Sequence, residues 1–278
     1  MPVEFGDYTA KASGLFNDHH NAGSIAFAKS GKVGSGDATY ELNVDNSVNG
    51  GPVNWSVNVN AGNFSMTHDH EGNISKKLDF TVKQVPGLSM SWAPAFSCAK
   101  GFGLGSLSTK YAHEKAVANF SLNLASPDNA DFDVSMAPFK GCFSAVNLGL
   151  KGNLSASGLK DGQWGFNMNK GDLELGFHST DLNSQKGQGS IYKALPGNNT
   201  FCCYGVEANT EDNSLAIAAA SAGCCSQGWR YKLDNKGTFS VAKNAKLNRS
   251  VGVCVSAAIN ATNMSAGGHS FGMKFSFE

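Results

Sequence analysis

Histidine and cysteine are the residues of this chain best suited to chemistry. His68 and His70 are two positions apart, so on a strand they would point the same way and could both approach a metal ion. A zinc site needs a third and a fourth ligand, and the His19-His20 pair lies elsewhere in the chain. We therefore interpret His68 and His70 as residues of a strand wall or its mouth, and we expect no metal or other cofactor.

The seven cysteines are an odd number, and no Cys-x-x-Cys spacing of the zinc type occurs. Cys202-Cys203 and Cys224-Cys225 are neighbours in sequence. Neighbouring side chains alternate across a strand, so we expect neither pair to bond internally. This pattern favours a reduced, intracellular protein over one built on disulfides.

Signatures of catalysis are weak. Gly101-Phe-Gly-Leu-Gly105 has part of the pattern of a dinucleotide-binding loop, but it lacks the strand-turn-helix context that such a loop requires. Close packing and bending explain glycine in a strand more simply. No Ser/His/Asp arrangement or carboxylate pair has positional support. We predict that the protein is not an enzyme.

Composition narrows the class of protein. The 278 residues contain 33 glycines, only 16% charged residues and no formal net charge. Arg230 and Arg249 are the only arginines, and no basic block with interleaved aromatics occurs, which argues against nucleic acid as a partner. The shortage of helix formers favours an all-β fold.

From Ala22 onward, apolar and polar residues alternate with a period of two. Clear apolar series are Tyr40, Leu42 and Val44; Leu173, Leu175 and Phe177; and Val251, Val253 and Val255. Turn signals such as Pro196-Gly197-Asn198-Asn199 separate the series, and each proline after Pro2 is expected at or near the end of a strand. We predict one domain over residues 1–278, a meander of more antiparallel strands than one sandwich uses.

The N-terminus carries the one helical pattern. An apolar stripe recurs at helical spacing in Phe5, Tyr8, Ala12, Leu15 and Phe16. Asp7 and Lys11 take the other side. The pattern predicts a helix over Phe5–Asn17, within a segment 1–21 that precedes the barrel at 22–278. Because the helix is short, it must be stabilised by packing against something larger.

The last strand has two distinct faces. Apolar side chains on one face are Phe271, Met273, Phe275 and Phe277, and the other face carries Ser270, Gly272, Lys274 and Ser276. Such a strand can close a barrel, since a sheet in lipid leaves no edge unpaired. Polar faces made of Gly, Ser, Asn and Thr suit a water-filled lumen. We predict a transmembrane β-barrel, with a soluble sandwich as the alternative.

Three stretches resemble one family. Phe5–Asn17 resembles the N-terminal helix of the mitochondrial voltage-dependent anion channels. Gly189-Ser190-Ile191-Tyr192 resembles a late strand of that family, and Ala266-Gly267-Gly268-His269 resembles the start of its closing strand. The pattern from Ser270 to Phe277 also resembles the sorting signal of mitochondrial outer-membrane barrels. The resemblance implies nineteen strands and a helix inside the pore, with Leu15 and Phe16 against the wall.

The implied function is passive diffusion of ions and small anionic metabolites, such as adenine nucleotides, across the mitochondrial outer membrane. The residues that would matter are those of the pore helix (Phe5, Asp7, Tyr8, Lys11, Leu15, Phe16) and those of the closing strand (Ser270, Gly272, Phe275, Phe277). Expected partners are membrane lipid and other copies of the chain or other mitochondrial membrane proteins. The alternatives are a related protein-import barrel and a soluble β-protein that binds carbohydrate.

Some positions depart from the family pattern. Ala10 and Asp18 stand where the family carries lysines, and His68 stands where it often has a lipid-facing glutamate. The net charge is also lower than the basic balance usual in the family. We therefore expect an anion preference weaker than that of the relatives, down to none.

Overall fold

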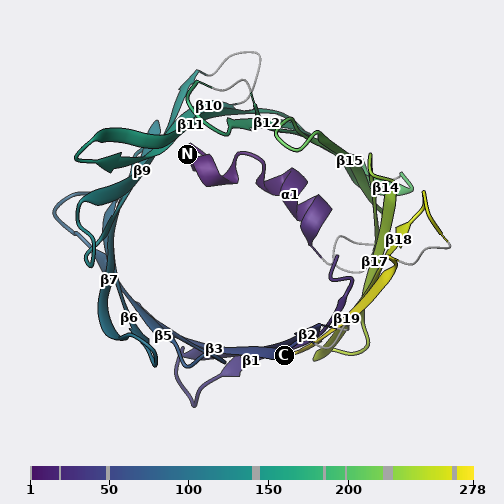
Figure 1. Ribbon diagram of the computed structural model, residues 1–278, viewed down its shortest axis with the longest axis horizontal. Coiled ribbons are helices and arrows are strands. Elements are labelled where there is room, and N and C mark those ends of the chain that lie inside the picture. The colour runs from purple at the N-terminus through teal and green to yellow at the C-terminus, as the bar shows by residue number, and fades with distance from the viewer. Residues whose placement is uncertain are drawn as a thin grey trace.

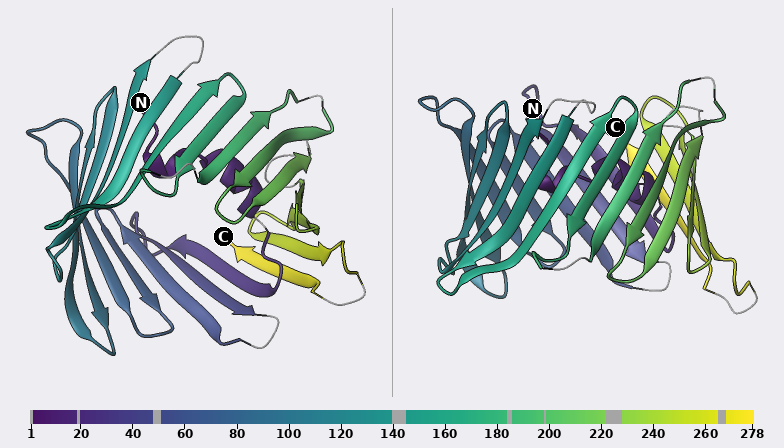
Figure 2. Two further views of the ribbon diagram at one scale, coloured as in Figure 1. Left: turned by 45° about the horizontal axis from the view of Figure 1, so that its top comes forward. Right: turned by 90° about the horizontal axis from the view of Figure 1, so that it is seen from above.

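The computed structural model describes residues 2–18, 20–47, 51–139, 145–183, 186–197, 199–221, 228–264 and 268–278. Within these ranges the strands form one closed sheet of nineteen strands, which surrounds the N-terminal helix (Figure 1). The strands cross the barrel obliquely (Figure 2). His19, Cys142, Cys224, Cys225 and Ala266-Gly267 lie outside the described residues.

The elements follow one another along the sheet in chain order. A 3₁₀-helix η1 (Phe5–Asp7) and an α-helix α1 (Ala10–Asn17) come first. The strands are β1 (Ser24–Lys32), β2 (Thr39–Ser47), β3 (Val53–Ala61), β4 (Phe64–Asp69), β5 (Ile74–Thr81), β6 (Leu88–Ser97), β7 (Gly101–Ala112), β8 (Ala116–Asn123), β9 (Asn129–Phe139), β10 (Ala145–Ser155), β11 (Gly158–Lys170), β12 (Leu173–Ser179), β13 (Gly187–Ala194), β14 (Phe201–Asn209), β15 (Ser214–Ser221), β16 (Trp229–Asp234), β17 (Thr238–Lys246), β18 (Val251–Asn260) and β19 (Ser270–Phe277).

The barrel closes between its first and last strands. Consecutive strands pair antiparallel, whereas β1 and β19 pair parallel, from Ile25 opposite Met273 to Lys29 opposite Phe277. An odd number of alternating strands requires this, because the first and last then run in the same direction. Phe27 and Phe275 stack across this pair with ring centroids 5.3 Å apart. The predicted all-β barrel of nineteen strands and its closing C-terminal strand are confirmed.

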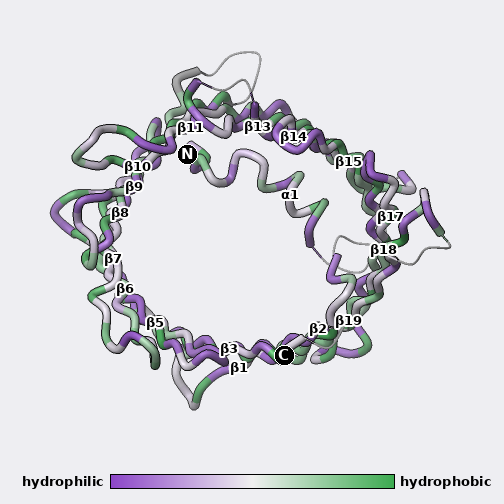
Figure 3. Tube along the Cα trace, viewed as in Figure 1, coloured by the Kyte–Doolittle hydropathy of each residue, from purple (hydrophilic) through white to green (hydrophobic). Residues whose placement is uncertain are grey.

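The two faces of the wall differ in chemistry. Large apolar side chains are exposed on the outside, among them Ile25, Phe27, Phe80, Phe120, Ile217 and Val255. The inner face carries polar residues such as Ser135, Asn147 and Asn167, and hydrophilic and hydrophobic residues are interspersed around the whole wall (Figure 3). An apolar outer face, a polar lumen and a sheet without edges are the features of a porin-like transmembrane barrel.

A β-bulge places one proline where the sequence did not predict it. Pro94 lies inside β6, at a register shift between Ala93 and Ala95, so the prediction that prolines fall at strand ends is wrong here. A bulge leaves one residue outside the hydrogen-bonded ladder, which tolerates a missing donor. Gly105 of β7 lies opposite with a φ of 69°, and a Cβ there would lie 1.7 Å from the Ala93 carbonyl oxygen. This bulge accounts for the last glycine of the Gly101–Gly105 stretch.

Replacing Gly272 with valine and Phe275 with alanine together is expected to impair assembly of the barrel. A Cβ on Gly272 would lie 1.8 Å from the Asn21 carbonyl oxygen, and Phe275 is the stacking partner of Phe27. Gly272 packs against the segment just before β1 and Phe275 stacks on β1, so both changes act where β19 meets the start of the barrel. The measurement is the protease-resistant fraction after insertion into vesicles. Phe271→Ala is the control, because Phe271 is 64% exposed and lies outside the register with β1. Equal yields from the double variant and the control would contradict the prediction.

Candidate functional site

The N-terminal segment lies inside the barrel, along the inner side of one part of the wall (Figure 1). η1 contacts β9 and β10, and α1 contacts β13, β14 and β15. The prediction of one continuous helix over Phe5–Asn17 is wrong, because the helix is interrupted at Tyr8 and Thr9. The Tyr8 carbonyl accepts a hydrogen bond from Asn167 Nδ2 at 2.8 Å, and the first α-helical bond runs to the carbonyl of Thr9 instead. The wall thus captures a carbonyl that a continuous helix would use.

Tyr8 anchors the first part of the segment. Its side chain is fully buried, and its hydroxyl lies 2.6 Å from Ser135 Oγ. Because Ser135 donates its own proton to the Val3 carbonyl at 2.5 Å, Tyr8 is the donor to Ser135. Burial raises the pKa of Tyr8 to about 12, so the hydroxyl keeps its proton at neutral pH. Val3 N–H also donates to Asn147 Oδ1 at 3.2 Å, which ties the start of the chain to β10.

Glycines of the wall make room for this segment. A Cβ on Gly149 would lie 2.6 Å from both the Phe5 ring and the Tyr8 hydroxyl, and a Cβ on Gly176 would lie 2.0 Å from the Tyr8 carbonyl oxygen. Gly205 lies beneath Leu15 in the same way, with 3.2 Å to its nearest methyl carbon. These glycines were not predicted as site residues from the sequence. The available signal was glycine at inward-facing positions of neighbouring strands.

The apolar stripe of α1 packs on small side chains. Ala12, Leu15 and Phe16 are buried against wall residues Cys203, Ala218 and Ala220. Lys232 extends from β16 over the Phe16 ring, with Nζ 5.8 Å from the ring centroid. Leu15 and Phe16 therefore lie against the wall, in the place that the resemblance implied.

Charged groups join the segment to the wall at three points. Glu4 forms an ion pair with Lys110, and Lys11 Nζ lies 2.8 Å from Glu174 Oε2. Arg230 Nη1 donates to the Gly14 carbonyl at 2.8 Å, where a cation offsets the negative end of the helix dipole. The Lys11 ammonium is paired with Glu174, yet the Lys11 side chain is 59% exposed, and Asp7 is exposed to the lumen as well.

Leu15→Asp is expected to detach α1 from the wall. The leucine side chain is 4% exposed, and a carboxylate there would lose its apolar contacts and be desolvated without a partner. The combined cost is of order 3 kcal/mol, enough to leave the helix largely undocked. Single-channel recordings should show altered gating or increased open-state noise. Ala10→Asp is the matched control, since Ala10 is exposed on the same helix. A record that matches the wild type would show that the contact at Leu15 does not hold the helix.

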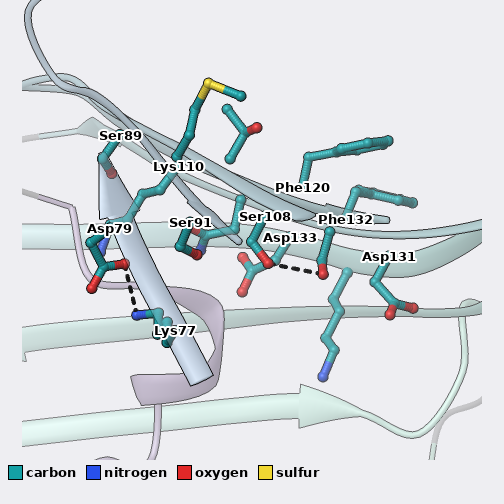
Figure 4. A pocket seen from close by; sticks show the side chains of 15 residues that line it. Lys77, Asp79, Ser89, Ser91, Ser108, Lys110, Phe120, Asp131, Phe132 and Asp133 are labelled. Carbon is teal, nitrogen blue, oxygen red and sulfur yellow. Dashed lines mark hydrogen bonds and ion pairs between the residues drawn. The ribbon is translucent and has the colours of Figure 1, made fainter. Parts of the chain in front are cut away.

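A cavity of about 380 Å³ lies on the wall beside the N-terminal segment (Figure 4). Its charged lining comes from several adjacent strands: Lys77, Asp79, Lys110, Asp131, Asp133 and Lys151. Lys77 Nζ and Asp79 Oδ1 lie 3.1 Å apart. Fixed charges of both signs on a solvated wall act on passing ions of either sign.

The charges are divided unequally between the two faces. This holds for the described strand residues that have a Cα partner on a neighbouring strand. Every Asp and Glu among them lies on the inner face. Five lysines among them lie on the outer face: Lys29, Lys76, Lys170, Lys193 and Lys243. Paired acids and bases of the inner face nearly balance, and the N-terminal segment adds Glu4, Asp7 and Asp18 against Lys11. The lumen therefore carries a small excess of negative charge.

The remaining predicted residues are dispersed. His68 faces outward from β4, edge-on to Trp55 with ring centroids 5.1 Å apart, and His70 lies beyond the end of the strand. The expectation that both histidines share one strand face is wrong. Across the described ranges, no three His, Cys, Asp or Glu side chains are grouped closely enough to hold a metal ion. On β19, Ser270 and Gly272 face inward, and Phe275 and Phe277 face outward with Val253 and Val251.

No helix within the described ranges is long and apolar enough to cross a membrane. Comparison of the sequence with protein-family models and with curated proteins finds no match.

Proposed function

We propose that this protein is a channel of the mitochondrial voltage-dependent anion channel type, through which ions and small metabolites diffuse passively across the mitochondrial outer membrane. The observation that carries the proposal is the docked N-terminal segment inside a closed barrel of nineteen strands. Glycines and small side chains of the inner wall make room for the segment, and the polar side of its helix faces the lumen. The segment lies along the β9–β15 side of the barrel and away from the opposite strands (Figure 1).

The proposed mechanism needs no fitted binding site. Solutes pass in water, and fixed charges on the wall and on the N-terminal segment select among them by sign and number. The docked segment narrows the passage on one side. Small anionic metabolites, adenine nucleotides included, are proposed cargo, attracted weakly by lumen lysines such as Lys274 and Lys232.

Reconstitution into a planar bilayer tests the proposal. The purified, refolded protein should give stepwise conductance increases, each from one inserted barrel. The same preparation unfolded in denaturant is the control for detergent and contaminants. Protein that stays in the aqueous phase during detergent-free carbonate extraction would exclude the porin and favour a soluble β-protein. Co-purification with small import subunits would favour the related protein-import barrel.

A further inference from the structure

An extra residue in β14 changes the direction of one cysteine side chain. Phe201 pairs with Ser221 and Cys203 pairs with Ala220, so Cys202 is the extra residue at a shift of the register. Such a bulge interrupts the alternation of side chains. The two Sγ atoms consequently lie 3.8 Å apart, close enough for a thiol–thiol hydrogen bond. The expectation that Cys202 and Cys203 point to opposite faces is wrong.

Both sulfurs lie on the lumen side, next to α1. Cys203 is buried beneath Leu15 and Phe16, and Cys202 is half-buried and packs on the same cluster. The two residues line a cavity of about 260 Å³ together with residues of the helix and with Arg230. Cys202 is thus the member of the pair that a solute in the pore can reach.

We propose that Cys202 and Cys203 form a redox-active dithiol in the pore wall, which reacts with small disulfides such as glutathione disulfide. Cys202 borders the cavity beside α1, so a small disulfide in the lumen can reach its sulfur, and the deprotonated thiol is the form that attacks. The inference depends on the bulge and the open lumen, and not on which metabolites the channel carries.

The reaction proceeds in two exchanges. The Cys202 thiolate attacks one sulfur of glutathione disulfide, which forms a mixed disulfide and releases one glutathione thiolate. Cys203, as a thiolate, then attacks the Cys202 sulfur and releases the second glutathione thiolate. The two thiol protons pass to these leaving groups. The dithiol gives up two electrons in total, and glutathione disulfide is reduced to two glutathione molecules.

Oxidation of the two cysteines is also expected to change the packing of α1 on the wall. The sulfurs must close from 3.8 Å to a bond of about 2.05 Å, and Cys203 can move only by changing its contact with Leu15 and Phe16. Such a contact change should alter the open-channel noise, and dithiothreitol should reverse it.

Peptide mapping of the folded, full-length barrel tests the dithiol. The protein in detergent is treated with glutathione disulfide, alkylated, and cut with trypsin and Glu-C. These proteases release Ala194–Glu207, a fragment whose only cysteines are Cys202 and Cys203. The expected fragment lacks two hydrogen masses and carries no alkyl group. With Cys203→Ala, the same treatment should leave one glutathione on Cys202, because the resolving thiol is gone.

The mass of the wild-type fragment is the deciding measurement, and the Cys203→Ala variant and Cys98 serve as comparisons. The wild-type fragment alone decides, so a Cys203→Ala variant that fails to fold leaves the result intact. Cys98, exposed in the turn after β6, is the internal reference for a single thiol and should retain a mixed disulfide. The proposal is overturned if the Ala194–Glu207 fragment keeps two alkylated thiols at every glutathione disulfide concentration, or if it carries two glutathiones. Because mass is the readout, this result is independent of whether the barrel conducts.

Discussion

Gly176→Ala is expected to detach the N-terminal segment from the barrel wall. The added Cβ would lie 2.0 Å from the Tyr8 carbonyl oxygen and 2.9 Å from its carbon, and both are backbone atoms that cannot rotate away. Asn167 holds the same carbonyl from β11, so the segment cannot rise without losing that hydrogen bond. Overpacking costs about 1–3 kcal/mol, and the lost contacts of Tyr8 add to it.

Protease accessibility measures this effect directly. Lys11 is the first trypsin site of the chain, and docking protects it. A loss of about 2 kcal/mol raises the undocked fraction roughly 30-fold, so cleavage after Lys11 should accelerate by a similar factor. Gly189→Ala on the neighbouring strand is the matched control, since its Cβ would meet nothing closer than 3.8 Å. If both variants are cleaved at the wild-type rate, Gly176 does not set the fit of the segment.

The pore is expected to show no anion selectivity. The departures from the family pattern predict an anion preference weaker than that of the relatives, down to none. The charges inside the barrel go further and have a small negative excess, because five paired lysines face outward and no paired carboxylate does. The reversal potential under a salt gradient should therefore lie at zero or slightly on the cation side. A strongly anion-selective reading would contradict the charge distribution described above.

A reciprocal pair of variants sharpens the measurement. Lys274 and Asp45 both face the lumen, one on either side of Ala26. A unit charge at roughly 10 Å in water contributes about 0.4 kcal/mol, so reversing one charge should change the permeability ratio roughly two- to fourfold. Lys274→Glu should shift it toward cations, and Asp45→Lys should shift it toward anions. Lys243→Gln is the control, because Lys243 lies outside against the Trp229 ring and should leave the ratio unchanged. A shift with Lys243→Gln would mean that the inner and outer faces are assigned wrongly.

Regular strands were predictable from the sequence because apolar and polar residues alternate along them. Tyr40, Leu42 and Val44 alternate without interruption, and the structure places them on the outer face of β2. The amphipathic stripe likewise predicted the helix around Leu15. In both cases the pattern of one short segment determines which side is buried, and no distant residue has to be known.

The features that sequence analysis missed depend on contacts between distant residues. The break at Tyr8 exists because Asn167, far along the chain, takes its carbonyl. The bulges at Pro94 and Cys202 each add one residue to a strand, and the local composition does not mark the addition. A strict polar–apolar alternation therefore assigns the residues after each bulge to the wrong face of the sheet. Gly176 is recognisable as a site residue only when it is known that Tyr8 packs against it.

The parallel pairing of β1 with β19 also has a consequence for biosynthesis. Every other pair joins consecutive strands and can form as a hairpin, but Ile25 must wait for Met273. Until then the sheet has two open edges, and a lipid core offers neither of them a hydrogen-bond partner. Joining the two ends of the chain is also the contact with the largest loop-closure cost. A chain that stops before Ser270 therefore cannot seal its wall, so pore formation reports that translation reached the final strand.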